Sequence, residues 1–372
     1  MGRAYAGQVD EVQRRAEDAL PGVPAAVWEP VAIGPESGFR NKAKMVVAGT
    51  VDQPTLGILD PRGRGVDLRD CGLHDPRLMA VLPALAEHVR TASLTPYDVA
   101  TRRGELKQVH ATVAPDGDLM VRWVLRSTEA LPRLRKHLPA LQAALGALVV
   151  ASANIQPVHA AIPEGPDEHV LSEAGALVID LPSSAGPLHL RLRPGGFLQT
   201  NHHVAAQLYD TASRWLAEPV SRPGLWDLYC GVGGFALAVG RSAADREAPA
   251  PAVVGVETSE EAVAAAEEAA AHSGAAARFV AADAGAYAAA ADPAAQPGTV
   301  VVNPPRRGIG DLADWLETSA VQRVLYSSCH LGSLAADLAR MPSWHVTRAR
   351  VFDMFPQTAH IETAVLLERQ TA

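Results

Sequence analysis

The stretch Asp227-Leu-Tyr-Cys-Gly-Val-Gly-Gly-Phe235 decides the fold of the C-terminal half of the chain. It ends an apolar strand, turns through glycines and opens a helix. Strand-like and helix-like segments alternate from there to the end, which predicts a doubly wound, mostly parallel sheet with ligands at the carboxyl ends of its strands. Strands are expected at residues 225–230, 253–257, 278–281, 299–303, 323–327, 346–352 and 362–368, with helices beginning at residues 204, 234, 260, 311 and 331.

The half of the chain before this sheet lacks such a regular alternation. Strand-like runs occur at residues 44–48, 119–125 and 149–156, and helical periodicity occurs at residues 77–91 and 131–145. We therefore expect an α+β domain here, ending at the turn-forming residues 182–187. This boundary divides the chain into an α+β domain of residues 1–185 and an α/β domain of residues 186–372.

The composition of the 372 residues, 48% apolar and 20% charged, is ordinary for a soluble globular protein. No apolar run approaches the roughly 20 residues that a membrane helix needs, and the N-terminus lacks the pattern of a secretory signal. Three widely separated cysteines argue against a disulfide framework. We therefore predict a cytoplasmic protein without a membrane partner.

The net charge of −8 does not suggest a nucleic-acid-binding protein, but the positive charges are clustered. Residues 102–136 carry eight Lys or Arg against four acids, and Arg40, Lys42 and Lys44 form a second cluster. Taken by themselves, such clusters are more often solvated faces than binding sites. Because phosphate contacts need only a local patch, an RNA partner stays open.

The glycine-rich turn at Gly231 and Gly233 has the features of a nucleoside-binding site. Glycines let the backbone pass close beneath a ligand, and Glu257 ends the next strand, where a carboxylate can accept bonds from ribose hydroxyls. The spacing is Gly-x-Gly-Gly rather than Gly-x-Gly-x-x-Gly, which favours S-adenosylmethionine over a dinucleotide. A turn that serves only packing is the alternative.

Asn303-Pro-Pro-Arg306 ends a later strand, and its two prolines fix an extended turn. It is either a ligand-binding turn or a rigid strand end. Gln199 and Asn201 are weaker signals, and Asn201 has the character of a helix N-cap.

Cys329 and Glu362 form a pair that suits covalent catalysis. C5 of uracil is too weak a nucleophile to attack a methyl sulfonium, but a thiolate that adds to C6 moves electron density onto C5. A base must then remove the C5 proton before the thiolate leaves. Cys329 suits the first role and Glu362 the second. The alternatives are a buried strand-end cysteine and a surface carboxylate.

Taken together, the motifs resemble the bacterial RNA uracil-C5-methyltransferases that use S-adenosylmethionine, most closely the branch acting on 23S ribosomal RNA. The matching segments are Gly38-Phe-Arg-Asn-Lys-Ala-Lys-Met45, Gly104-Glu-Leu-Lys107, Gly196-Phe-Leu-Gln-Thr-Asn201, Asp227 to Phe235, Asn303-Pro-Pro-Arg-Arg-Gly-Ile-Gly310, Tyr326-Ser-Ser-Cys329 and Asp353-Met-Phe-Pro-Gln-Thr-Ala-His-Ile-Glu362. They run in family order through nearly the whole chain, so they are far more specific as a set than singly.

The resemblance implies a Rossmann-like methyltransferase domain preceded by an RNA-binding α+β domain. It implies that Cys329 is the nucleophile and Glu362 the proton acceptor, acting on a uridine extruded from 23S rRNA. The implied cofactor contacts are Gln199, Tyr229, Gly231, Gly233, Glu257 and Asn303, and the implied RNA contacts are Arg40, Lys42, Lys107 and Arg306. We expect a monomer.

The chain departs from the ribosomal branch in its cysteines. That branch usually carries an iron–sulfur cluster on three N-terminal cysteines and a fourth further on. Cys71 matches the fourth, but the first three have no counterpart in this sequence. Because one cysteine cannot hold a cluster, we expect no metal here, whether the cluster was lost or the chain begins late.

Three other functions stay open at this point. The same chemistry could act on transfer RNA. Asn303-Pro-Pro also occurs in amino-methyltransferases, although that chemistry needs no nucleophilic cysteine and its turn normally continues with an aromatic residue rather than Arg306. A non-catalytic RNA-binding or assembly factor would bind RNA without transferring a methyl group.

Overall fold

The computed structural model describes residues 4–160, 162, 164–244 and 252–369. The chain forms two compact units, and it passes between them more than once. The first unit comprises Met1–Glu36, Asp180–Arg191 and Gly196–Ala372, and the second comprises Ser37–Ile179 and Leu192–Gly195. Each unit is built around its own sheet.

The first unit contains an eight-stranded sheet. Its order is β1 (Trp28–Ala32), β16 (Trp344–Phe352), β17 (Glu362–Arg369), β15 (Arg323–Ser328), β14 (Thr299–Val302), β11 (Leu225–Leu228), β12 (Val253–Glu257) and β13 (Ala277–Ala281). Strand β17 is antiparallel to both neighbours, and the other pairs are parallel. The predicted doubly wound, mostly parallel sheet is therefore confirmed.

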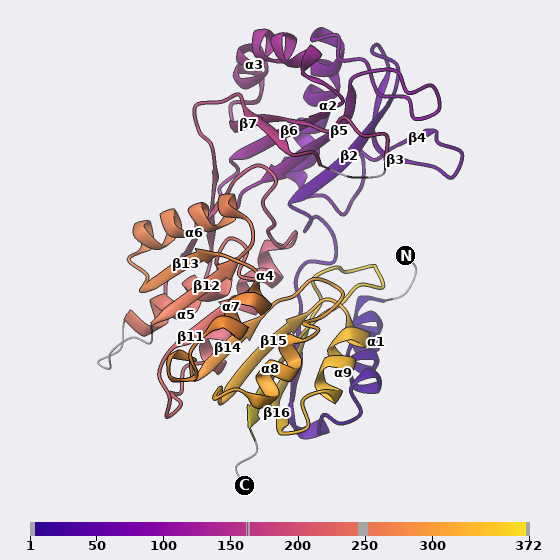
Figure 1. Cartoon of the computed structure of the whole chain (residues 1–372). Helices are drawn as coiled ribbons and strands as arrows, with labels where there is room; N and C mark the ends of the chain where they lie inside the picture. The colour runs from indigo at the N-terminus through magenta and orange to yellow at the C-terminus, as the bar shows by residue number, and fades with distance from the viewer. Residues whose placement is uncertain (1–3, 161, 163, 245–251, 370–372) are drawn as a thin grey trace. The chain divides into compact units, whose positions relative to one another are not determined.

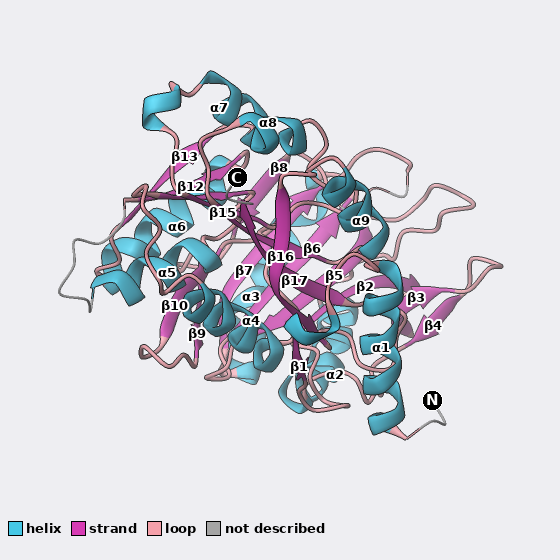
Figure 2. Ribbon diagram, turned by 90° about the horizontal axis from the view of Figure 1, so that it is seen from below, coloured by secondary structure: helices cyan, strands magenta, loops and turns pink. Residues whose placement is uncertain are grey.

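Helices cover both faces of this sheet (Figures 1 and 2). One face carries α4 (His202–Trp215), α5 (Gly234–Ala244) and α6 (Glu260–Ser273), and the other carries α1 (Tyr5–Ala19), α7 (Ala284–Ala290), α8 (Leu312–Thr318) and α9 (Leu331–Ala339). Buried side chains of α7, α8 and α9 pack with Trp226, Val302 and Tyr326 in one apolar cluster. The Asn201 side chain accepts a hydrogen bond from the amide of Val204 at 3.3 Å, which confirms the predicted N-cap of α4.

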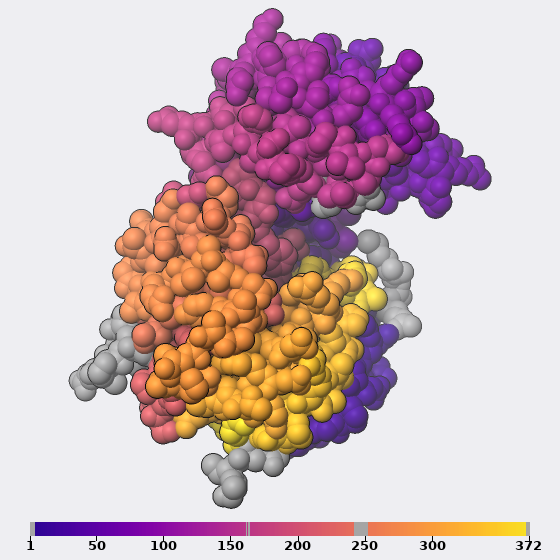
Figure 3. Space-filling model, viewed as in Figure 1, coloured from indigo at the N-terminus to yellow at the C-terminus, as the bar shows by residue number. Residues whose placement is uncertain are grey.

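The observed division differs from the predicted boundary after residue 185. Residues 182–187 form the turn between β9 (Leu177–Leu181) and β10 (Leu188–Leu192), a two-stranded sheet, rather than a linker. The N-terminal segment joins the first unit because β1 pairs in parallel with β16 and α1 contacts α9. In the space-filling view this indigo segment lies against the yellow C-terminal segment (Figure 3).

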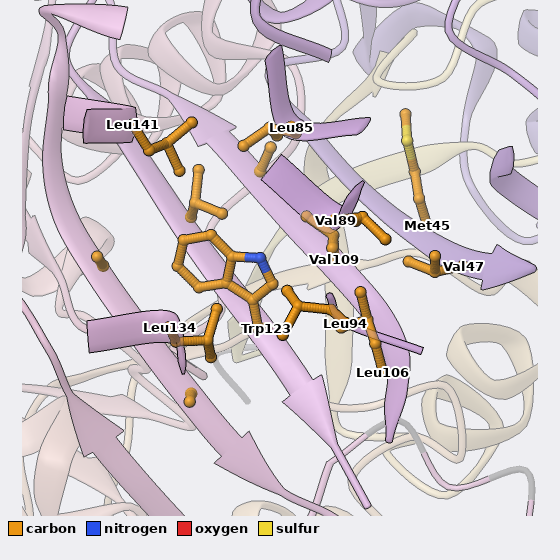
Figure 4. Close-up of a cluster of buried hydrophobic side chains, with 14 of the residues drawn as sticks. Met45, Val47, Leu85, Val89, Leu94, Leu106, Val109, Trp123, Leu134 and Leu141 are labelled. Atoms are coloured by element: carbon orange, nitrogen blue, oxygen red, sulfur yellow. The ribbon is translucent and has the colours of Figure 1, made fainter. Parts of the chain in front are cut away.

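The second unit contains a seven-stranded sheet with two helices. The strand order is β4 (Gly65–Asp67), β3 (Pro54–Leu59), β2 (Lys42–Gly49), β5 (Leu106–Val113), β6 (Leu119–Leu125), β7 (Leu148–Ile155) and β8 (Asp167–Val170); the helices are α2 (Pro76–Thr91) and α3 (Leu131–Leu145). Side chains alternate along β2, so that Met45 and Val47 enter the core while Lys44 is exposed. Figure 4 shows Trp123, which is fully buried, among the leucines and valines of this core.

Three single-turn 3-10 helices complete the described elements, at Ala25–Val27, Thr128–Ala130 and Pro293–Ala295. Within the described ranges, every helix is too short or too polar to cross a bilayer.

Candidate active site

The turn between β11 and α5 leaves open space beside one of its glycines. Tyr229, Gly231 and Gly233 all have positive φ, at 67°, 55° and 81°. The two glycines adopt this conformation without strain, whereas it is uncommon for a tyrosine. A Cβ atom on Gly233 would lie 2.8 Å from the Phe279 ring, so this glycine is required by packing. A Cβ atom on Gly231 would meet nothing within 4 Å, so the backbone there faces space that a ligand could fill.

Two carboxylates support this turn from β11 and β12. Asp227 is fully buried, and its Oδ2 accepts a hydrogen bond from the amide of Ala236 at 2.9 Å. Burial raises the pKa of Asp227 to about 7. Glu257 ends β12, and its Oε2 accepts a hydrogen bond from the Gly231 amide at 3.2 Å. The predicted cofactor residues Gly231 and Glu257 are therefore in direct contact.

A cavity of about 530 Å³ lies at the carboxyl ends of β11 and β13. Tyr229, Asp283 and Trp315 contribute to its lining, and Trp315 stacks on the buried Trp226 with ring centres 6.0 Å apart. Asp283 also caps α7, where its Oδ1 accepts a hydrogen bond from the Ala286 amide. Sequence reasoning missed Asp283, although a carboxylate two residues after a strand of a parallel sheet is the signal that could have found it.

The remaining two predicted cofactor residues border the ends of other elements of the first unit. Asn303 is half-buried and directly follows β14, while Gln199 is buried in the segment before α4. Apart from Gln199, the residues that a nucleoside could contact therefore come from the strand ends of one sheet, as expected for a doubly wound fold.

Cys329 directly follows β15 and is half-buried. It lines a cavity of about 190 Å³ together with Arg306, His330 and His360. Arg306 Nη2 lies 2.9 Å from His360 Nδ1. Burial raises the pKa of the Cys329 thiol, and the negative charge of Glu362 raises it further, whereas the Arg306 guanidinium lowers it.

The sheet register places Glu362 beside Cys329. Strands β15 and β17 pair antiparallel, with Ser327 opposite Ala364 and Ser328 opposite Thr363. Cys329 directly follows Ser328 and Glu362 directly precedes Thr363, so both lie at the same end of this strand pair, where the charge of Glu362 acts on the Cys329 thiol. Two residues 33 positions apart in the sequence thus meet because of one strand pairing.

Glu362 is buried, with 2% of its surface exposed. Burial raises its pKa to about 7, and a hydrogen bond from Ser327 Oγ to Glu362 Oε1 at 2.5 Å opposes that increase. A carboxyl group with such a pKa can accept and return a proton near neutral pH. Ser327 was not predicted, because a serine in an apolar strand has no distinctive sequence signal.

The other predicted RNA-contacting residues lie in the second unit, apart in sequence from Arg306. Arg40 Nε donates a hydrogen bond to the Lys42 carbonyl oxygen at 3.1 Å. Burial lowers the pKa of Lys42 to about 8. Lys107 Nζ donates to the Val158 carbonyl oxygen at 2.8 Å and lies over the Tyr97 ring. Lys42 is therefore largely buried, and Lys107 is held by contacts within its own unit. Neither is a freely solvated side chain of a basic surface.

Cys71 is half-buried with a free thiol. Among the described residues, no group of three or more His, Cys, Asp or Glu side chains is arranged to hold a metal ion.

Comparison with known proteins identifies the family of this chain. A family model described as tRNA (Uracil-5-)-methyltransferase matches residues 294–370, which include Cys329 and Glu362. The 23S rRNA (uracil(747)-C(5))-methyltransferase RlmC of Halothiobacillus neapolitanus is 45% identical over 98% of this chain and 94% of that protein. RlmC of Escherichia coli O157:H7 is 44% identical over 94% of this chain and 91% of that protein.

A solved structure shares the whole fold. The Pyrococcus abyssi tRNA (uracil-54, C5)-methyltransferase in complex with S-adenosyl-L-homocysteine matches with a TM-score of 0.78 at 19% identity, over 98% of this chain and 83% of that chain. At this identity the likeness shows the fold alone. The identity of 44–45% to the RlmC proteins, over nearly the full length of the chain, confirms the family resemblance. The chain belongs to the S-adenosylmethionine-dependent RNA uracil-C5-methyltransferases.

Proposed function

We propose that this enzyme methylates C5 of one uridine in 23S rRNA, with Cys329 as the nucleophile and Glu362 as the proton acceptor. The observation that carries the mechanism is that Cys329 lines a small cavity at the end of the β15–β17 pair, where the charge of the buried Glu362 acts on its thiol. The choice of ribosomal RNA, and of uracil 747, follows the names of the relatives that share 43–45% of the sequence. Such a substrate places the enzyme in the cytoplasm, where we expect it to act as a monomer.

The residues at the strand ends fit S-adenosylmethionine. The open space beside Gly231 admits a ligand close to the backbone, and the Glu257 carboxylate beside it offers acceptors for ribose hydroxyls. Tyr229 and Asp283 line the adjoining cavity. S-adenosylmethionine, when bound, supplies the methyl group and is converted into S-adenosylhomocysteine.

The Cys329 thiolate adds to C6 of the uracil ring, forming a C–S bond and moving an electron pair toward C5 and O4 as an enolate. C5 then forms its bond to the methyl group. Glu362 removes the proton that C5 still carries, the electron pair of that C–H bond restores the C5–C6 double bond, and the C–S bond breaks to release the thiolate. One methyl group enters the ring and one proton leaves it.

The electrostatics of the site suit this sequence of steps. Arg306 opposes the increase in the pKa of Cys329 and so favours the thiolate. The raised pKa of Glu362 makes its carboxylate a stronger base than an exposed glutamate, and the proton it accepts is stable near neutral pH. The carboxylate form is needed for catalysis, so activity should fall as the pH drops below about 7.

Transfer RNA is the second candidate substrate, because the matching family model is described as a tRNA methyltransferase. The chemistry would be the same, and only the RNA would differ.

RNA containing 5-fluorouridine tests this proposal. Fluorine cannot leave as a proton does, so the methylated covalent complex should persist on a denaturing gel. We expect this complex from the wild type and from a Cys71→Ser control with a 23S rRNA fragment, and none from Cys329→Ala. A complex formed only with transfer RNA would correct the substrate. Full methylation by Cys329→Ala would refute the covalent mechanism and favour an amino-methyltransferase.

A further inference from the structure

The N-terminal helix α1 lies along the segment that leads to Glu362. Tyr5 donates a hydrogen bond through its hydroxyl to Asp353 Oδ2 at 2.7 Å, and Gln8 Nε2 donates to Gln357 Oε1 at 3.3 Å. One and two turns further along the same helix face, Val12 and Ala16 are buried against Val351 and Ile361. Helix α1 is therefore fixed, from Tyr5 to Ala16, to the end of β16 and to the segment between β16 and β17.

Arg15 lies on the same face and belongs to the lining of the Cys329 cavity. Its Nη2 donates a hydrogen bond to the carbonyl oxygen of Ala359 at 2.9 Å, which holds the guanidinium beside His360 and near the start of β17. Arg14, its neighbour in the sequence, is exposed, and its Nε donates to the Asp10 carbonyl oxygen within the helix. Of these two adjacent arginines, only Arg15 is directed to the cavity.

The cavity around Cys329 is basic. Arg15 and Arg306 contribute guanidinium groups and His330 and His360 contribute imidazoles, while no Asp or Glu belongs to its lining in the part of the chain that the structure describes. A neutral uracil ring does not need two guanidinium groups. A nucleotide brings an anionic phosphate with the base, and arginine matches the oxygens of a phosphate with two parallel N–H donors.

We propose that Arg15 and Arg306 bind a backbone phosphate of the target uridine when its base enters the Cys329 cavity. The inference rests on the proposed function, because it takes the extruded nucleotide of the RNA substrate as the ligand. Extrusion costs unstacking free energy, and a phosphate held by the enzyme at the extruded nucleotide offsets part of that cost. Arg15 is then a substrate-binding residue supplied by the N-terminal helix.

The test compares Arg15→Gln and Arg15→Lys with the matched control Arg14→Gln. Glutamine keeps an N–H donor for the Ala359 carbonyl but removes the charge, and lysine keeps the charge. With a 23S rRNA fragment, we expect Arg15→Gln to raise KM for RNA about tenfold with kcat nearly unchanged. The slope of log affinity against log salt should decrease by up to about 0.7, the value for one phosphate of a single strand, since Arg306 still faces the same phosphate. Arg15→Lys should keep the wild-type slope, and Arg14→Gln should match the wild type throughout.

A modified substrate locates the contact. When a neutral methylphosphonate replaces the phosphate next to the target uridine, the wild type and Arg15→Gln should have the same KM. When the methylphosphonate lies five nucleotides away, the KM of Arg15→Gln should stay higher than that of the wild type. The inference is overturned if Arg15→Gln keeps the wild-type KM and salt slope. It is also overturned if only kcat falls, since Arg15 would then act by holding the segment before Glu362. A wild-type enzyme that methylates no RNA would refute the proposed function instead.

Discussion

Replacing Ser327 with alanine should move the pH dependence of catalysis. Ser327 Oγ donates to Glu362 Oε1 at 2.5 Å, and both side chains are buried, so water cannot take the place of the hydroxyl. A hydrogen bond to a charged group contributes about 1.5–3 kcal/mol, which corresponds to a displacement of about one to two pH units. The pKa of Glu362, about 7 in the wild type, should therefore rise in the variant.

The direction in which the pH dependence moves follows from the chemistry at C5. Only the carboxylate form of Glu362 accepts the proton, so activity is lost as the pH falls, and a higher pKa moves this loss to higher pH. At pH 7, Ser327→Ala should release methylated RNA roughly 5 to 50 times more slowly than the wild type, and at pH 9 the difference should shrink to about twofold or less.

The assay is single-turnover release of methylated RNA between pH 6 and pH 9. Ser328→Ala is the matched control, because Ser328 is the next residue of the same strand and its hydroxyl donates to the His330 carbonyl oxygen rather than to Glu362. The reasoning is refuted if the acid limb of Ser327→Ala coincides with that of the wild type or moves to lower pH while the variant stays folded.

Three further predictions concern the same unit. Arg306→Gln should raise the pKa of Cys329 and slow its alkylation by iodoacetamide roughly tenfold at pH 8, because the guanidinium favours the thiolate. Gly233→Ala should lower the free energy of unfolding in urea by at least about 2 kcal/mol, since the new Cβ would meet the Phe279 ring at φ 81°. Glu362→Gln should change the pH dependence of stability. The folded wild type keeps its proton up to about pH 7 and the unfolded chain loses it near 4.5, so wild-type stability should fall by about 3 kcal/mol more than that of the variant between pH 4.5 and pH 8.

Each of these has a control within the chain. Alkylation is measured in a Cys71→Ser background, because Cys71 is the other half-buried thiol and Cys230 is buried. Gly231→Ala is the partner of Gly233→Ala, since it has a positive φ but no neighbour within 4 Å, and equal losses in the two variants would contradict the packing argument. Faster alkylation in Arg306→Gln, or parallel stability curves for Glu362→Gln and the wild type, would contradict the electrostatic account.

Local sequence patterns predicted most of the regular elements. Helix α3 spans the predicted residues 131–145, and β7 lies within one residue of its predicted bounds, because periodic burial decides both. Helix α1 and strand β1 were missed, as were β3, β4, β5, β8, β9, β10 and α7. The place of β1 depends on pairing with β16 more than 300 residues later, a non-local contact that leaves no local pattern, whereas the helical spacing of Val12 and Ala16 in α1 could have been recognised.

The sequence predicted those candidate site residues whose side-chain type suits only a few chemical roles. The chemistry of uracil methylation made Cys329 and Glu362 candidates, but a buried strand-end cysteine and a surface carboxylate stayed open until the whole set of family motifs was considered. Ser327 and Arg15 were missed because serine and arginine are common, and only the strand register and the packing of α1 bring them to the site. Asp283, by contrast, carries a local signal, since it follows a strand of the parallel sheet and caps the next helix.

Glu362→Gln with an unmodified 23S rRNA fragment and S-adenosylmethionine tests the central claim most directly. Without a base, the C5 proton stays in place and the thiolate cannot leave. Mass spectrometry should therefore find a covalent complex of protein, RNA and one added methyl group, with the RNA attached to the peptide that contains Cys329. Release of free methylated RNA at the wild-type rate, or attachment at another residue, would contradict the proposed roles of Cys329 and Glu362.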